Sequence, residues 1–190
     1  MQSKLISFLA VMVLALSSQL ALADKFAEAR QVFQDAGESA AFFNNSYGYA
    51  LFPSIGKGGI GVGGAYGDGK VFVGGKEVGK TSMTQLSVGF QLGGQVYSQI
   101  IFFEDKRAFD DFSSGNFEFS AQATAVAITA GASAQSSTGG GSSAGASGGQ
   151  KDASTVSAGY NKGMAVFTVA KGGLMYEAAL AGQKYSYEAL

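Results

Sequence analysis

The chain has 190 residues, and its 13 basic and 14 acidic side chains give a net charge of −1. It contains no cysteine and no histidine, so disulfides, a lipoprotein anchor and most thiol, imidazole and soft-metal chemistry are excluded. The near balance of charge disfavours a nucleic-acid-binding protein, which is usually basic. Because catalysis would depend on carboxylates, lysines or hydroxyls, we expect a protein that is not an enzyme and uses no cofactor or metal.

The first 23 residues have the three parts of a secretory signal peptide. Lys4 supplies the positive charge, residues 5–16 are mostly apolar, and Ala21-Leu22-Ala23 forms a small-residue cleavage site. The apolar run is short for a bilayer span, and an uncleaved anchor is the alternative. We therefore expect a signal peptide over 1–23, a location in the periplasm or outside the cell, and one domain over 24–190.

Residues 24–44 show helical periodicity. The apolar side chains recur at three- and four-residue steps, at Phe26, Ala29, Phe33, Ala36, Ala40 and Phe43. This predicts an amphipathic helix whose apolar face packs on the core. The alternative is a helix that lies on a membrane, which its few basic residues make weaker.

Glycine is dense from residue 47 to 94, where apolar residues tend to alternate as in short antiparallel strands. The run breaks at Pro53. In a strand over 60–66, the apolar side chains would face away from a nearly bare row formed by glycine and Ala65. Such a row predicts close approach of another backbone or a ligand. Gly67-Asp68-Gly69 predicts a hairpin turn before a strand over 70–73.

Further strands are expected over 83–90, 96–103, 164–170, 174–181 and 184–187, with strand-like alternation over 117–129. The nearly continuous apolar run 96–103 should be central, and a short helix carrying Phe109 and Phe112 should follow it. Residues 131–154 are mostly Gly, Ser and Ala with almost no large apolar residue, and they predict a mobile loop or linker. The expected fold is α+β, predominantly antiparallel β as a barrel or strongly curved sheet, with an N-terminal amphipathic helix and a short mid-chain helix.

Two glycine motifs match nucleotide-binding patterns, but their context argues against that chemistry. Residues 74–81 fit the phosphate-loop pattern and residues 59–64 fit the dinucleotide pattern. Both patterns require a helix that starts at the motif, whereas residues 81–90 alternate like a strand. We therefore expect no nucleotide partner.

Charged residues near predicted turns give two further candidate groups. The pairs Glu104-Asp105 and Asp110-Asp111 favour solvated charges, and a carboxylate-dependent hydrolase is the alternative. Four lysines stand beside glycines or at turns: Lys57, Lys80, Lys162 and Lys171. If they gather at one end of a barrel they can receive a lipid phosphate; otherwise they are ordinary turn lysines.

Three segments together resemble the SYLF domain, a lipid-binding domain of the yeast actin-binding type. They are the apolar–Pro–Lys-Gly-Gly-x-Gly-x-Gly-Gly block over 49–66, residues 88–95, and residues 162–187. The resemblance implies a compact, β-rich domain that binds phospholipids, phosphoinositides in eukaryotes, with help from an N-terminal amphipathic helix. Some members bind actin, and bacterial members similar to this chain are exported. The lipid surface that it implies consists of the lysines near Lys57 and the helix side chains Phe26, Phe33, Phe42 and Phe43.

The chain departs from the family pattern in two places. Residues 131–154 resemble an insertion, and Val78-Gly79-Lys80-Thr81 stands where relatives commonly have a tryptophan. The weakly basic helix argues against phosphoinositide specificity, and no actin partner is expected. The expected function is therefore an exported, non-catalytic protein that binds anionic phospholipid or the envelope surface. The alternative is an envelope structural or interaction module whose glycine-faced strands meet a protein partner.

Overall fold

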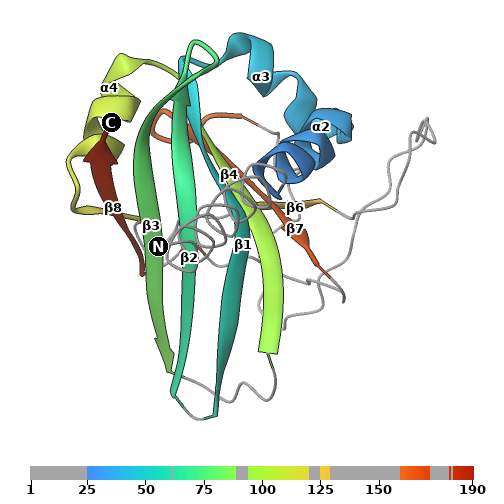
Figure 1. Ribbon diagram of the computed structural model, residues 1–190, viewed down its shortest axis with the longest axis vertical. Coiled ribbons are helices and arrows are strands. Elements are labelled where there is room, and N and C mark those ends of the chain that lie inside the picture. Colours follow the sequence, from blue (N-terminus) through green and yellow to red (C-terminus); the bar gives the residue numbers. More distant parts are fainter. Residues whose placement is uncertain are drawn as a thin grey trace, which may run out of the picture.

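The structure is a computed structural model that describes residues 25–60, 62–88, 94–119, 125–128, 159–171, 180 and 182–190 (Figure 1). The chain begins with helical residues 25–35. The elements that follow are α2 (Gly37–Ala40), α3 (Phe42–Asn45), β1 (Gly48–Ile60), β2 (Val62–Val73), β3 (Lys76–Val88), β4 (Gly94–Phe103), α4 (Lys106–Ser113), β5 (Phe117–Glu118), β6 (Val126–Ile128), β7 (Met164–Ala170) and β8 (Gln183–Ala189).

The strands form one eight-stranded sheet in the order β5-β8-β3-β2-β1-β4-β7-β6. Every neighbouring pair is antiparallel except β6 and β7. β5 and β6 lie at opposite edges, yet only residues 119–125 separate them in the chain. A flat sheet of this size would be roughly 33 Å wide, more than about 28 Å of extended chain can cross. The sheet therefore has to curl, and the predicted α+β fold with a strongly curved antiparallel sheet is confirmed.

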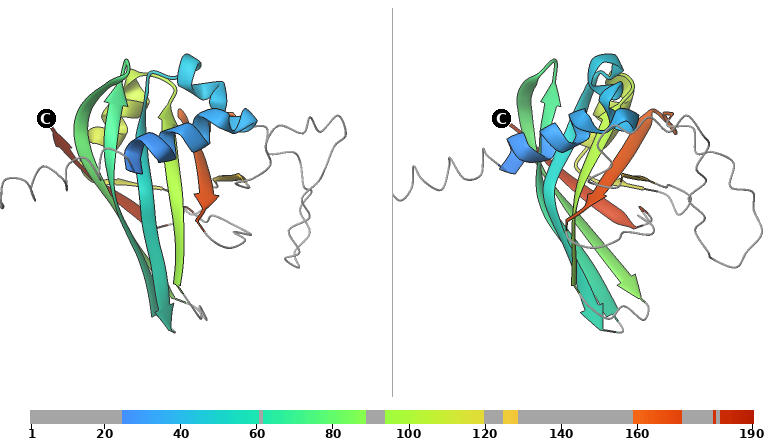
Figure 2. Two further views of the ribbon diagram at one scale, coloured as in Figure 1. Left: turned by 45° about the vertical axis from the view of Figure 1, so that its right-hand side comes forward. Right: turned by 90° about the vertical axis from the view of Figure 1, so that its right-hand side faces the viewer.

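Hydrophobic clusters lie on both faces of the sheet. On the outer face, Tyr49 and Leu51 of β1 pack with Phe33 and Phe42 of the N-terminal helical segments. On the inner face, the intervening residues of β1 belong to a second cluster that includes Phe112 of α4. Figure 2 shows the N-terminal helical segments lying across the upper part of the strands. Alternate side chains of β1 thus belong to two hydrophobic clusters, one on each face of the sheet. The predicted packing of the helix on the core is confirmed.

Pro53 marks a β-bulge in β1. The register shifts between Leu51 and Gly56 toward β2 and between Phe52 and Ile55 toward β4. Proline has no N–H to donate to a ladder, so it is tolerated where pairing is interrupted. The extra residue keeps the side chains of both Phe52 and Ile55 in the inner cluster.

Two glycines of β2 lie under these same side chains. A Cβ on Gly69 would lie 2.6 Å from the Phe52 ring, and a Cβ on Gly67 would lie 2.6 Å from Cγ1 of Ile55. The backbones of Gly59 and Gly63 also approach closely near the β1–β2 connection. The general expectation that glycine marks close approach is therefore confirmed.

The predicted hairpin turn at Gly67-Asp68-Gly69 is wrong. β2 runs without interruption from Val62 to Val73, and the register pairs Ile60 with Val62. The chain therefore reverses between Ile60 and Val62, inside the segment that we expected to be one strand. The next connection is at Gly74 and Gly75, where φ is +57° and +78°. Gly67 and Gly69 thus allow close packing, whereas Gly74 and Gly75 allow a turn. The sequence alone does not distinguish these two uses of glycine.

Most other predicted elements agree with the structure. Residues 96–103, 164–170 and 184–187 lie within β4, β7 and β8, and the helix with Phe109 and Phe112 is α4. The helix expected over 24–44 is interrupted at residues 36 and 41. The segment 83–90 is strand as far as Val88, and only 117–118 and 126–128 of the segment 117–129 are strands among the described residues. Predictions for 1–23 and 131–154 lie outside the described residues, as does the strand predicted over 174–181 except for Leu180, which is described and is not part of a strand.

Candidate functional site

The outer face of β2 divides into a covered half and an uncovered half. Alternate residues of this strand face outward. Phe72 packs against the outer cluster, and Lys70 Nζ lies 5.1 Å from the centroid of the Phe26 ring. Farther along the strand, Tyr66 and Val62 are 54% and 67% exposed. The N-terminal helical segments therefore cover one half of this face and leave the other half to solvent.

One row of directly paired residues crosses six strands of the uncovered half. All its members are exposed, and each is the register partner of the next: Glu118, Lys184, Thr84, Tyr66, Gly56 and Val96. Beyond Val96, the backbone N–H of Lys171 donates to the Val96 carbonyl at 2.8 Å. The middle of the row is thus uncharged, formed by Thr84, Tyr66, Gly56 and Val96, with Lys184 toward one end and Lys171 beyond the other.

A second row lies closer to the strand ends and is mostly glycine. Leu86, which is 85% exposed, pairs with Gly64, which in turn pairs with Gly58. A Cβ on Gly64 would approach only a backbone oxygen, at 3.4 Å, and one on Gly56 would meet nothing within 4 Å. We give the name bare patch to exposed apolar side chains of the uncovered half: Val62, Tyr66, Leu86 and Val96 (42% exposed). Contiguous exposed apolar surface of this kind commonly marks an interaction site.

A hollow of about 570 Å³ lies in the uncovered half, which is a volume typical of small-molecule sites. Its lining comes from β1, β2, β3, β5, the start of β8 and Gly182: Gly56, Gly64, Ala65, Tyr66, Thr84, Gln85, Leu86, Glu118, Gly182 and Lys184. The apolar part is formed by glycine backbone with Tyr66 and Leu86. The charged part is the ion pair of Lys184 Nζ and Glu118 Oε2, at 3.5 Å. The hollow therefore has an apolar side and a charged side.

The structure does not gather the four predicted lysines in one place. Lys57 pairs with the buried Ala65, which places it on the inner face, whereas Lys171 Nζ lies 3.4 Å from Ser54 Oγ near the bare patch. Lys80 is on β3, beside Lys70 and Glu188. Lys162 occupies a tight turn with φ of +52° near the opposite end of the sheet. A role in lipid binding stays a prediction for each, and only Lys171 adjoins the uncovered half.

The four predicted phenylalanines lie at the junction of the helical segments and the sheet. Phe33 and Phe42 are buried, and Phe42 contacts Phe102 and Phe167 at ring-centroid distances of 5.4 and 5.1 Å. Phe26 and Phe43 are half-buried and pack on the same cluster. Their lipid contacts stay a prediction, and in this structure their apolar surface is directed mainly to the outer core.

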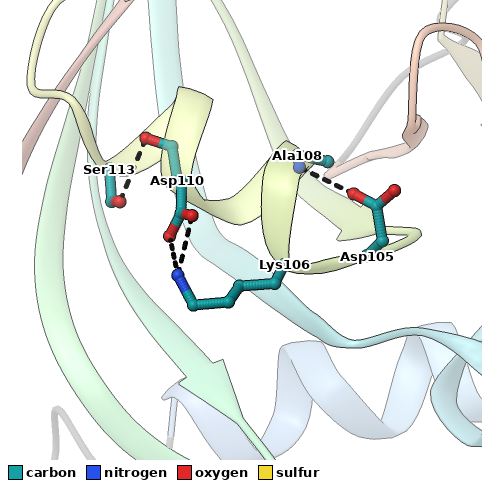
Figure 3. Close-up of polar contacts among 5 residues, drawn as sticks. All are labelled: Asp105, Lys106, Ala108, Asp110 and Ser113. Atoms are coloured by element: carbon teal, nitrogen blue, oxygen red, sulfur yellow. Dashed lines mark hydrogen bonds and ion pairs between the residues drawn. The ribbon is translucent and has the colours of Figure 1, made fainter.

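Three of the four acids around α4 have structural partners, and those of Asp105 and Asp110 are drawn in Figure 3. Asp105 is the N-cap, because its Oδ1 accepts a hydrogen bond from the Ala108 N–H at 2.8 Å. Asp110 forms an ion pair with Lys106 at 2.7 Å, and Asp111 lies 3.8 Å from Arg107. All these acids are exposed, and no cluster of three metal-ligand side chains exists within the described part of the chain. The expectation that these are solvated structural charges agrees with this geometry.

Behind the uncovered half, the inner face carries a buried polar cluster. Gln99 Nε2 donates to the Tyr185 hydroxyl at 2.7 Å, and Gln183 Nε2 donates to the Tyr97 hydroxyl at 3.3 Å. Burial raises the pKa of Tyr97 to about 12 and holds the pKa of Tyr185 well above its ordinary value of 10.0. Both phenols therefore stay neutral. Gln99 Oε1 and its cross-strand neighbour Thr168 Oγ1 have no partner among the described residues.

Comparison with known proteins identifies the family. The family described as "Las17-binding protein actin regulator", Ysc84, matches residues 84–187, which is more than half of the chain. The chain belongs to the Ysc84 (SYLF) family. Within this family, a relative from Aeromonas veronii named beta cell expansion factor A is 29% identical over 157 residues. That match covers 82% of this chain and 51% of the relative, so the chain spans about half the length of this Ysc84 relative.

Family membership confirms the resemblance to the SYLF domain and places the chain in a family of binding domains. The matched region of the Ysc84 family begins in the middle of β3 and ends in β8, so it includes Thr84, Leu86 and Lys184 of the hollow. None of the helices that the structure describes in this family member is long and apolar enough to cross a membrane.

The sequence analysis did not identify the hollow or the bare patch. Tyr66 and Val62 were correctly placed on one side of a strand, but their strand partners were unknown. The available signal was the pairing across residue 61, which brings Gly56 beside Tyr66 and Gly58 beside Gly64. Placing the reversal correctly between Ile60 and Val62 would therefore have brought these glycines together on the sheet.

Proposed function

We propose that the protein binds phospholipid surfaces through the uncovered half of its sheet, without catalysis. The observation that carries this proposal is the bare patch, whose exposed apolar side chains lie between Lys171 and Lys184. Apolar side chains flanked by lysines complement an anionic bilayer. The apolar side chains insert at the boundary of the acyl region, and the phosphates attract the lysines. Membership in the Ysc84 family supports a binding role.

The expected strength is that of reversible attachment. Full burial of Val62 and Leu86, the two most exposed members of the bare patch, would contribute roughly 3–6 kcal/mol gross. Each lysine near an anionic surface adds about 1 kcal/mol. The sum is too small for permanent anchoring, so the protein should leave the membrane when salt or neutral lipid reduces the attraction.

Vesicle co-sedimentation tests the proposal. The wild type should pellet with phosphatidylcholine vesicles that contain phosphatidylglycerol and much less with phosphatidylcholine alone. Val62→Ser combined with Leu86→Ser should abolish pelleting. The matched control is Val32→Ser, because Val32 is also an exposed valine (40%) but lies on the N-terminal helix. Equal pelleting of the double variant and the control, or no pelleting of the wild type, would overturn the proposal and favour a protein partner for the bare patch.

We further propose that the protein is exported and cleaved before Asp24. The support is the charge, apolar run and small-residue site within residues 1–23. N-terminal sequencing of the protein recovered from a bacterial periplasmic or culture fraction should give Asp24 as the first residue. Recovery of the full-length chain in the cytoplasmic fraction alone would contradict this proposal.

A further inference from the structure

We infer that the hollow, which shares Tyr66 and Leu86 with the bare patch, is a binding site for one anionic amphiphile, a single acyl chain with a carboxylate or phosphate head. The inference deepens the proposed function and rests on it, because the same uncovered half would meet the membrane that supplies the ligand. The two roles differ. The hollow would bind one amphiphile molecule that has left the bilayer, whereas the bare patch would attach the protein to the bilayer surface.

The apolar side of the hollow suits an alkyl chain. Its floor is glycine backbone at Gly56 and Gly64, where a Cβ would meet nothing within 4 Å or only a backbone oxygen at 3.4 Å. The exposed side chains of Tyr66 and Leu86 flank this floor. A groove with bare backbone below and apolar side chains beside it accepts a flexible chain without displacing any side chain of the fold.

The opposite side of the hollow supplies a cation and a hydroxyl. Lys184 Nζ is 3.5 Å from Glu118 Oε2, and its side chain is 67% exposed. A pair this long and this exposed holds the ammonium weakly, so Lys184 can turn toward an anionic head. Thr84, the register partner of both Lys184 and Tyr66, makes no side-chain hydrogen bond within the described part of the chain. Its hydroxyl lies between the charged and apolar sides, where the head and chain of an amphiphile join.

Isothermal titration calorimetry tests the site with soluble lauroyl amphiphiles below their micelle concentrations. The probes are laurate, lauroyl lysophosphatidylglycerol and the zwitterionic lauroyl lysophosphatidylcholine. We expect one-to-one binding of at least one of the two anionic probes, and weaker binding of the zwitterionic probe. Laurate and the lysophospholipid separate a carboxylate head from a phosphate head. Equal affinity for all three probes, or no saturable binding, would overturn the inference.

Two variants locate the site. Gly56→Val fills the floor at a strand position with open space, so the fold should persist while binding falls at least about tenfold. Lys184→Gln should weaken only the anionic probes, by about three- to fivefold. The control Gly37→Ala, at an exposed position of α2 with no atom near its Cβ, should leave affinity unchanged. Unchanged binding in Gly56→Val, with the fold confirmed by circular dichroism, would overturn the location.

The design separates this inference from the proposed function. Tyr66 and Leu86 belong to both surfaces, but Val62 does not line the hollow and Gly56 is not part of the bare patch, so Val62→Ser and Gly56→Val each change one surface alone. Vesicle pelleting without saturable binding of a soluble probe would overturn the hollow and leave the membrane surface intact. Saturable probe binding that Gly56→Val abolishes, without vesicle pelleting, would support the hollow and overturn the membrane surface.

Discussion

The covered and uncovered halves of the outer face differ although the same strands form both. In β2, Phe72 and Lys70 face the N-terminal helical segments, and Tyr66 and Val62 face solvent along the same side of the same strand. Apolar side chains occur in both halves. What differs is the presence of a second layer above the sheet. The comparison teaches that alternation fixes the direction of a side chain, whereas the neighbouring elements decide its burial.

The inner face supports both halves, and this explains how the uncovered half stays folded. Behind the bare patch, Ile55, Met83 and Tyr185 are fully or almost fully buried in the inner cluster. The strands behind the bare patch are therefore stabilised by packing on their inner face. The uncovered half is the part of the outer face where apolar side chains are available to a ligand without any loss of core packing.

The largest effect should come from removing a side chain of the covered half. Phe33→Ala should lower the free energy of unfolding by about 3–5 kcal/mol, because Phe33 is fully buried between helix and sheet. Leu86→Ala in the uncovered half should change it by no more than about 0.5 kcal/mol. Urea denaturation followed by circular dichroism measures both. Similar losses in the two variants would show that the bare patch is covered in solution.

Alkaline pH should weaken the support behind the uncovered half. The pKa of Tyr97 is raised from 10.0 to about 12 by burial, so the folded state holds this proton more tightly than the unfolded state. The resulting stabilisation is complete below pH 10 and is lost as the pH rises to about 12. The loss attributable to Tyr97 should be about 2–3 kcal/mol. The midpoint temperature of thermal unfolding should fall less steeply from pH 9 upward in Tyr97→Phe than in the wild type. An equal slope in the two proteins would contradict this assignment.

Alanine substitutions at Gly69 and Gly56 should affect stability differently, because the two glycines have different surroundings on opposite faces of the sheet. Gly69→Ala should destabilise the fold by about 1–3 kcal/mol, because its Cβ would lie 2.6 Å from the buried Phe52 ring. Gly56→Ala in the hollow should be neutral or slightly stabilising, because its Cβ meets open space. Midpoints of urea unfolding compare the two variants directly. Equal destabilisation would mean that the floor of the hollow is packed in solution.

The smallest effect is expected at the border between the halves. Lys70 lies over the Phe26 ring and forms an ion pair with Glu77 at 2.7 Å. Lys70→Met should cost about 0.5–1 kcal/mol and should speed amide exchange in residues 25–35. Lys80→Met is the matched control on the paired position of β3. Equal exchange in both variants would show that the N-terminal helical segment is held by apolar packing alone.

Local pattern was enough to predict much of the fold. The apolar run at residues 96–103 and the spacing of Phe109 and Phe112 correctly gave β4 and α4, since each is encoded within a few neighbouring residues. Gly67 and Gly69 misled the prediction because their function is to lie under Ile55 and Phe52, which belong to another strand. Distant packing of this kind leaves no mark on the local sequence.

The candidate site was beyond sequence analysis for the same reason. Its row joins residues from six strands, and the pairing of Lys184 with Thr84 links positions that are 100 residues apart. The resemblance to the SYLF domain correctly identified the family, but it directed attention to the helix face and to Lys57. Successive side chains of a strand point to opposite faces of the sheet. Gly56 belongs to the outer face, so the next residue, Lys57, lies on the inner face.

The position of β8 has a consequence for the synthesis of the chain. This strand begins at Gln183, and it lies between β3 and β5. The growing polypeptide therefore exposes one long edge of β3 until the residues of β8, Gln183–Ala189, have left the ribosome. A translation product that stops before Gln183 would retain that open edge and lack Tyr185 in its interior, so it should aggregate.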